Sequence, residues 1–148
     1  MKSHPYLRAF MAGILVPTLV LPLLLIAFVV LRLGLKISFP IERGLVFPMA
    51  LVPALWGVWS MLWQWTRERT HVPLGLHGAV LPLLMMPLGG LIATRVGVLE
   101  LAATSVTWFN AITVPYALIA LFLAAAMVAY YLAWKYVVGY VNQVLGIA

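Results

Sequence analysis

The chain has 148 residues, of which 66% are hydrophobic and only 8% are charged, with a net charge of +6 and no cysteine. A soluble domain carries about a quarter of its residues as charged ones, and a fold of this size has too little interior to hide so much apolar surface from water. The composition therefore excludes an ordinary soluble domain, and the lack of cysteine excludes disulfides, thiolate metal sites and a cysteine nucleophile.

Four long uncharged runs follow one another along the chain, and every charged residue lies between or beyond them. The runs are Ala9–Leu31, Gly44–Thr66, Thr70–Thr94 and Leu101–Trp134. A helix needs about 20 apolar residues to cross the hydrocarbon, and backbone groups in lipid must be satisfied within the span. We therefore predict an all-α integral membrane protein, a single membrane domain of residues 1–148, with four transmembrane helices at about 9–31, 44–66, 74–94 and 110–134.

The first run resembles neither a signal peptide nor a lipidated anchor. Lys2 and Arg8 precede it as a short basic region. The apolar stretch is longer than the core of a signal peptide, and no cleavage pattern of small residues closes it. We therefore expect it to remain as the first span.

Prolines occur in all four predicted spans. Proline lacks an N–H and clashes with the carbonyl one turn back, so it kinks a helix. The predicted kinks are at Pro17, Pro22, Pro48, Pro53, Pro82, Pro87 and Pro115. Two interpretations remain open: the kinks form a hinge or line a lumen, or they are static and improve the packing of the bundle.

Aromatic residues gather at the ends of two spans. Trp56, Trp59 and Trp63 follow the spacing i, i+3, i+7 and share one helix face. They form either a stacking wall for an aromatic ligand or an aromatic belt at the membrane surface, and we expect the belt. The expected interfacial aromatic anchors are Trp56, Trp59, Trp63, Trp65, Trp108, Tyr130, Tyr131 and Trp134.

The connections between runs carry the charges. Residues 95–110 contain Arg95 and Glu100, and we expect them to form either an interfacial helix or an extension of the fourth span. With four spans, the side of the two termini holds Lys2, Arg8, Arg67, Arg69 and Lys135, whereas the other holds Arg32, Lys36, Arg43 and Arg95. Basic residues favour the cytoplasmic side, so we expect both termini there.

Parts of the first half recur in the second half. Pro17 and Pro22 have the same spacing as Pro82 and Pro87, and Leu31–Leu35 resembles Thr94–Val98. Pro48–Val52 likewise resembles Pro115–Ile119. If the match is not chance, the chain consists of two helical hairpins repeated in parallel about an axis along the membrane normal.

The spans contain few groups able to perform chemistry. The carboxylates Glu42, Glu68 and Glu100 lie outside them, and the histidines are His4, His71 and His77. Binding of haem or a metal needs ligand residues on helices that face each other, and the sequence offers no such pair. We therefore expect no catalytic residues, no metal and no cofactor. The polar residues Thr18, Ser60, Gln64, Asn110 and Thr113 are expected to form interhelical hydrogen bonds.

Three functions remain open. The favoured one is a non-enzymatic membrane subunit or scaffold that packs against partner helices in a larger complex or self-assembles as a homo-oligomer. The second is a small oligomeric transporter or channel for a hydrophobic or aromatic solute. The third is an interfacial enzyme acting on lipid through residues such as Glu42, Arg43, His71 or Glu100. Membrane lipid is an expected partner and nucleic acid is not, because the basic residues are scattered singly.

Overall fold

The computed structural model describes residues 4–36 and 47–147, so Glu42 and Arg43 lie outside the described residues. Helix α1 (Pro5–Val29) continues into a π-helical segment, η1 (Val30–Gly34), and α2 (Phe47–Thr70) and α3 (Leu74–Arg95) follow. Strands β1 (Leu99–Leu101), β2 (Ser105–Trp108) and β3 (Ile112–Pro115) precede α4 (Tyr116–Leu132), which runs without a break through the π-helical η3 (Ala133–Val138) into α5 (Gly139–Val144).

Three of the described helical runs are long and apolar enough to cross a membrane: Pro5–Gly34, Leu74–Arg95 and Tyr116–Val144. Helix α2 has 24 residues, but its tryptophans, Ser60 and Gln64 lower its mean hydropathy and it is not among the three. The predicted third span, 74–94, is confirmed as a helix, and the first lies within a longer helical run.

The last apolar helix differs in its bounds from the predicted fourth span. It begins at Tyr116 and extends to Val144, whereas the sequence predicts 110–134. Residues 99–115 form neither an interfacial helix nor a helical extension, but an antiparallel sheet in the order β1-β2-β3. The fold is therefore mainly helical rather than all-α. β-Branched residues are common in this segment and fit a pleated sheet better than a helix.

A tight turn joins β2 to β3. The Ala111 N–H donates to the Trp108 carbonyl at 2.9 Å, and Phe109 and Asn110 both have positive φ, 52° and 53°. Two successive positive φ angles characterise the turn type whose twist matches that of a hairpin. The turn explains why the chain reverses here instead of continuing as helix.

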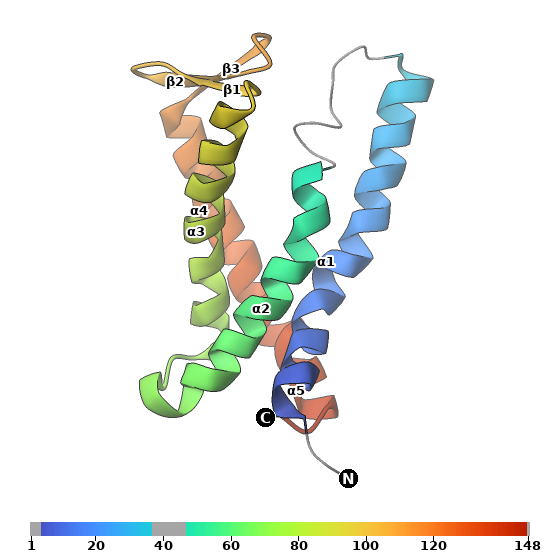
Figure 1. The fold of residues 1–148 in the computed structure, drawn as a ribbon, viewed down its shortest axis with the longest axis vertical. Helices are drawn as coiled ribbons and strands as arrows, with labels where there is room; N and C mark the ends of the chain where they lie inside the picture. The colour runs from blue at the N-terminus through green and yellow to red at the C-terminus, as the bar shows by residue number, and fades with distance from the viewer. Residues whose placement is uncertain (1–3, 37–46, 148) are drawn as a thin grey trace.

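One of the seven predicted kink positions is not inside a helix: Pro115 is the residue before α4. Proline is tolerated there because a helix start leaves its N–H groups unbonded anyway. Pro48 is the second residue of α2, next to residues outside the described ones. Pro17, Pro22, Pro53, Pro82 and Pro87 do lie inside helices, and α1 changes direction part-way along its length (Figure 1).

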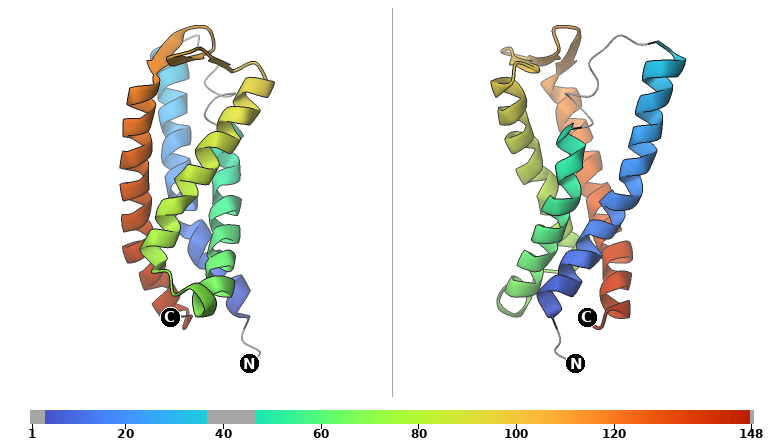
Figure 2. Two further views of the ribbon diagram at one scale, coloured as in Figure 1. Left: turned by 90° about the vertical axis from the view of Figure 1, so that its left-hand side faces the viewer. Right: turned by 45° about the vertical axis from the view of Figure 1, so that its right-hand side comes forward.

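The helices form two hairpins, α1–α2 and α3–α4, which diverge toward the sheet (Figure 1). Helices α1 and α3 run toward the sheet, whereas α2 and α4 run back, as the two views of Figure 2 also show. The start of α1 and the end of α5 lie together at the opposite end. We call these two ends of the molecule the sheet end and the terminal end.

Buried helical residues gather toward the terminal end. In α1 they are Ala9, Ala12, Gly13 and Pro17, and in α3 they are Gly75, Gly78, Leu81 and Pro82. Helix α4 has no buried residue, whereas η3 has Trp134 and Val138. The two hairpins are therefore held together near the terminal end, and the halves of α1, α3 and α4 that approach the sheet contribute no buried residue.

Candidate functional site at the junction of the two hairpins

Small residues allow α1 and α2 to touch. A Cβ atom built on Gly13 would lie 2.6 Å from the Trp56 carbonyl oxygen and 2.8 Å from the Ser60 Cβ. A Cβ atom on Gly57 would overlap the ring of Phe10. Such close backbone approach is the usual means by which membrane helices associate, so these glycines position α2 with Ser60 facing the interior.

The second hairpin closes in the same way. A Cβ atom on Gly78 would fall within the indole of Trp134, and one on Gly75 would lie 2.8 Å from the Tyr131 ring. Trp134 is fully buried. Its indole is thus seated directly on the backbone of α3, which places it at the point where the two hairpins meet.

Aromatic rings from α2, α3, α4 and η3 form the centre of this junction. The Trp56 ring lies 4.7 Å from that of Tyr130 and 5.5 Å from that of Trp134, centroid to centroid. His77 stacks on Trp59 at 4.6 Å and lies 5.9 Å from Trp134. We call these five residues the aromatic junction.

Hydrogen bonds connect α2 to α3 within the aromatic junction. The Trp59 indole N–H donates to the His77 carbonyl at 2.9 Å, and His77 Nε2 donates to the Trp59 carbonyl at 3.1 Å. Because the carbonyl can only accept, the proton of this imidazole must be on Nε2. His77 therefore bridges the two hairpins.

Two of the predicted interfacial anchors are buried inside the protein. Trp56 and Trp134 are only 3% and 0% exposed, and both belong to the core. A lipid-facing belt and a packed core require the same residue types, so the sequence pattern does not separate them. Trp59 and Tyr130 pack against that core. For the other predicted anchors, Trp63, Trp65, Trp108 and Tyr131, the anchoring role stays a prediction.

Buried polar atoms accompany the aromatic junction. Ser60 and Asn142 are 0% and 1% exposed. Neither their side-chain atoms nor the Trp134 Nε1 has a hydrogen-bond partner among the described residues. Ser60 was expected to form an interhelical hydrogen bond, and Asn142 was not predicted at all. Ser60 follows Trp56 by one helical turn and Asn142 follows Val138 by one turn, so both lie on interior faces.

Two arginines close the terminal end. Arg8 Nη1 donates to the Leu145 carbonyl at 3.0 Å, and Arg67 Nη1 donates to the Ile147 carbonyl. The last carbonyls of a helix, such as that of Leu145 at the end of α5, have no partner within it and carry the negative end of its dipole, whereas Ile147 lies beyond the helix. The first turn of α1 and the last turn of α2 therefore hold the end of the chain in place.

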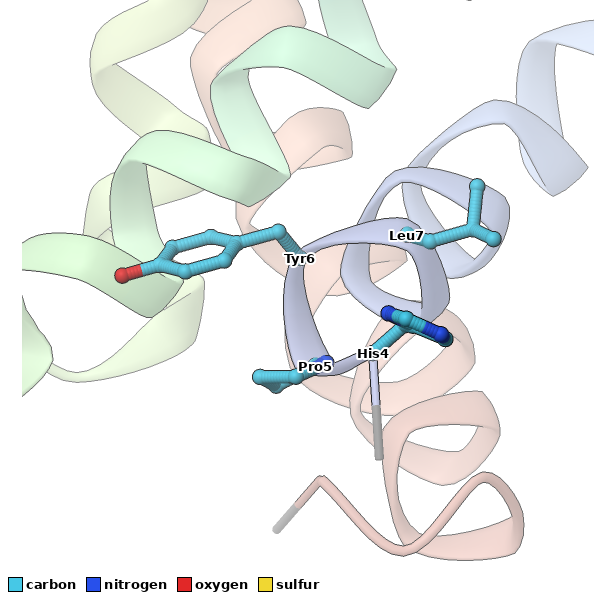
Figure 3. A pocket seen from close by; sticks show the side chains of 4 residues that line it. All are labelled: His4, Pro5, Tyr6 and Leu7. Atoms are coloured by element: carbon cyan, nitrogen blue, oxygen red, sulfur yellow. The ribbon is translucent and has the colours of Figure 1, made fainter. Parts of the chain in front are cut away.

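The junction is neutral and aromatic, with hydrogen-bonding groups but no carboxylate. Among the described residues, no three side chains of the metal-binding types come together. A surface pocket at the start of α1 is formed by four consecutive residues, His4 to Leu7, and Figure 3 shows the Tyr6 ring pointing away from the His4 and Leu7 side chains. That pocket does not converge on any reactive group.

The chain was compared with protein-family models, with curated proteins and with solved structures, and none of the three comparisons finds a match.

Proposed function

We propose that this chain is a non-enzymatic membrane subunit or scaffold, whose sheet-end half packs against partner helices or further copies of itself. The distribution of buried residues carries the proposal. α4 has no buried residue over Tyr116–Leu132, and the buried residues of α1 and α3 all precede residues 18 and 83. Two hairpins joined at one end leave long apolar helix faces available for other helices.

The proposal includes four spans, with α2 crossing as well. α1 and α3 run in the same direction (Figure 1), and both are long and apolar enough to span. If both cross, α2 must return the chain to the side from which α3 starts. The tryptophans lower the mean hydropathy of α2, but two of them do not face lipid fully. Trp56 is buried, and Trp59 packs against the core.

Small residues support the packing of partners on the sheet-end half. A Cβ atom built on Gly89 or Gly90 of α3 would meet nothing within 4 Å. Ala117, Ala120 and Ala124 of α4 are exposed as well. In lipid, helices associate through surfaces that let their backbones approach closely, so these positions suit a neighbouring helix.

Orientation and symmetry belong to the same proposal. The terminal end has Arg8, Arg67, Arg69 and Lys135 among its described residues, which favours the cytoplasmic side for both termini. Each half consists of a helix toward the sheet end and a helix back from it. This supports the proposed parallel repeat, in which residues 9–66 superpose on 74–134.

The test is gentle extraction from native membranes, followed by measurement of the particle mass and identification of stoichiometric components. The proposal expects a particle larger than one 16.3 kDa chain with its lipid and detergent. A particle containing one chain alone, under conditions that preserve known complexes of the same membrane, contradicts it.

Matched variants separate a partner surface from a lipid surface. Ala124→Leu adds bulk to the exposed face of α4, and Val128→Leu adds one methylene one turn further on. We expect Ala124→Leu to release the partner without lowering the stability of the isolated chain, and Val128→Leu to retain it. Equal retention by both variants argues that lipid covers this face.

A small transporter is a second candidate, and the unpartnered polar atoms of Ser60 and Asn142 favour it. Buried polar groups without partners are costly and are found where a solute or water is bound. The transporter function expects Ser60→Ala to abolish flux of a small solute into proteoliposomes while the protein remains folded. Wild-type protein that carries no solute across the bilayer removes this candidate.

A further inference from the structure

The sheet has one apolar and one polar face. In an antiparallel sheet, directly paired residues share a face, and Leu99 pairs with Trp108, which pairs with Ile112. The row two residues along the strands pairs Leu101 with Val106 and Val106 with Val114. The apolar face therefore consists of Leu99, Leu101, Val106, Trp108, Ile112 and Val114.

The opposite face is polar. The row between the two apolar rows pairs Glu100 with Thr107 and Thr107 with Thr113. The hydroxyl groups of the two threonines lie 3.1 Å apart and form a hydrogen bond. With its amide nitrogen turned toward Glu100, Asn110 donates to that carboxylate at 3.0 and 3.1 Å. The two threonines thus form one hydrogen-bonded pair and Asn110 and Glu100 another. Glu100, Asn110 and Thr113 are exposed, as expected of a surface in contact with water.

The apolar face is covered only in part. Leu99 and Val106 are 6% and 5% exposed, but Leu101 and Ile112 on the same face are 64% and 52% exposed. The sheet lies across the ends of α3 and α4 and extends beyond them (Figure 1). The helix ends therefore cover the middle of the face and leave its margin bare.

The bare margin continues the lipid-facing surface of the helices. Leu91, Ile92 and Val96 at the end of α3 are more than half exposed, and α3 and the α4 run are both apolar enough to cross a membrane. A sheet joined directly to two such helices lies at the depth where the hydrocarbon ends. An apolar face there is stabilised by lipid, and the indole of Trp108 suits the headgroup region.

We propose that the β1-β2-β3 sheet is a membrane-surface element, which lies flat on the bilayer with Leu101, Ile112 and Trp108 in the acyl–headgroup boundary and with Glu100, Thr107 and Thr113 in water. Its ligand is the lipid surface itself. This inference requires only that α3 and α4 span the membrane. It holds whether or not the chain is a subunit of a larger complex.

The lack of cysteine makes a direct test possible. Single variants Leu101→Cys, Ile112→Cys and Thr113→Cys are labelled with a nitroxide and reconstituted at low protein density into phosphatidylcholine vesicles. Electron paramagnetic resonance then measures collision with oxygen, which concentrates in lipid, and with a water-soluble nickel complex. Thr113 is the matched control because it neighbours Ile112 on the same strand but belongs to the polar face.

The proposal expects the ratio of oxygen to nickel accessibility to be severalfold higher at positions 101 and 112 than at position 113. Equal ratios at all three positions would show that the two faces of the sheet have the same environment, and would overturn it. Protection of position 101 from both reagents would mean that protein covers this face, and would overturn it too. Circular dichroism and gel filtration check the fold of each variant, and positions 101 and 112 serve as independent reporters.

Discussion

Trp59 and His77 exchange two hydrogen bonds, each donating from its ring to the other's backbone carbonyl, at 2.9 and 3.1 Å. Their rings are stacked with centroids 4.6 Å apart. One residue belongs to each hairpin, so this reciprocal pair connects the two halves of the molecule near the terminal end.

Removal of the indole donor of Trp59 will weaken the connection. Trp59→Phe keeps an aromatic ring but loses the N–H, and leaves the His77 carbonyl without that donor. We expect a loss of about 1 kcal/mol, the usual size of an intramembrane hydrogen bond. Unfolding of the purified protein by increasing sodium dodecyl sulfate measures it. Trp65→Phe is the control, because Trp65 is 55% exposed, and equal losses in both variants would refute the role assigned to Trp59.

A methyl group at Gly78 will disturb the seat of Trp134. Gly78→Ala forces the indole or the α3 backbone to move, and overpacking of this kind costs about 1–3 kcal/mol. Gly89→Ala is the matched control on the same helix, because nothing lies within 4 Å of its new methyl group. Alanine favours a helix over glycine by about 0.5–1 kcal/mol, so the control should be neutral or slightly more stable. Thermal unfolding in detergent compares the two, and a Gly78→Ala variant as stable as the control would contradict the packing.

Loss of the Arg8 or Arg67 side chain will loosen the end of the chain. Arg8→Gln and Arg67→Gln remove the guanidinium groups that donate to the Leu145 and Ile147 carbonyls. We expect faster hydrogen exchange in peptides covering residues 142–147, with no change in α3. Arg69→Gln is the control, because Arg69 stacks over Trp65 at 5.5 Å instead. Unchanged exchange in both variants would show that the two arginines do not hold this end.

Ser60→Ala will not destabilise the protein. The Ser60 hydroxyl is buried without a partner among the described residues, and removing an unsatisfied buried polar group is neutral or stabilising. Thr66→Val on the same helix is the comparison, because the Thr66 hydroxyl donates to the Leu62 carbonyl at 2.9 Å. Detergent unfolding measures both. A clear loss of stability in Ser60→Ala would mean that the hydroxyl is bonded in the membrane.

The helices were predictable because continuous apolar runs have few other solutions in lipid. The absence of charge does not predict the sheet, because Leu101–Trp134 contains no charge whether it forms a helix or a strand. The β-branched segment from Ser105 to Val114 was the available signal. Asn142 is not predicted for a related reason: it lies beyond Lys135, the charged residue that ends the last uncharged run.

The candidate site depended on contacts between distant residues. Trp56 and Trp134 are 78 positions apart, by subtraction of their numbers, and nothing local distinguishes a ring in a belt from a ring in a core. The glycines that seat these rings were recognisable as close-approach positions, but their partners were not. Hydrophobic patterning therefore predicts which segments form long apolar helices, and only the structure shows which of their faces meet.

The most direct test of the central claim is the membrane sidedness of four positions in the natively cysteine-free chain. Single cysteines at Thr70 and Gln143, near the terminal end, and at Leu35 and Ala103, near the sheet end, are reacted with an impermeant maleimide in intact cells and in inverted vesicles. A bundle of four crossing helices predicts that Thr70 and Gln143 react from one side, and Leu35 and Ala103 from the other. Reaction of Thr70 from the same side as Leu35 would show that α2 does not cross, and would contradict the account.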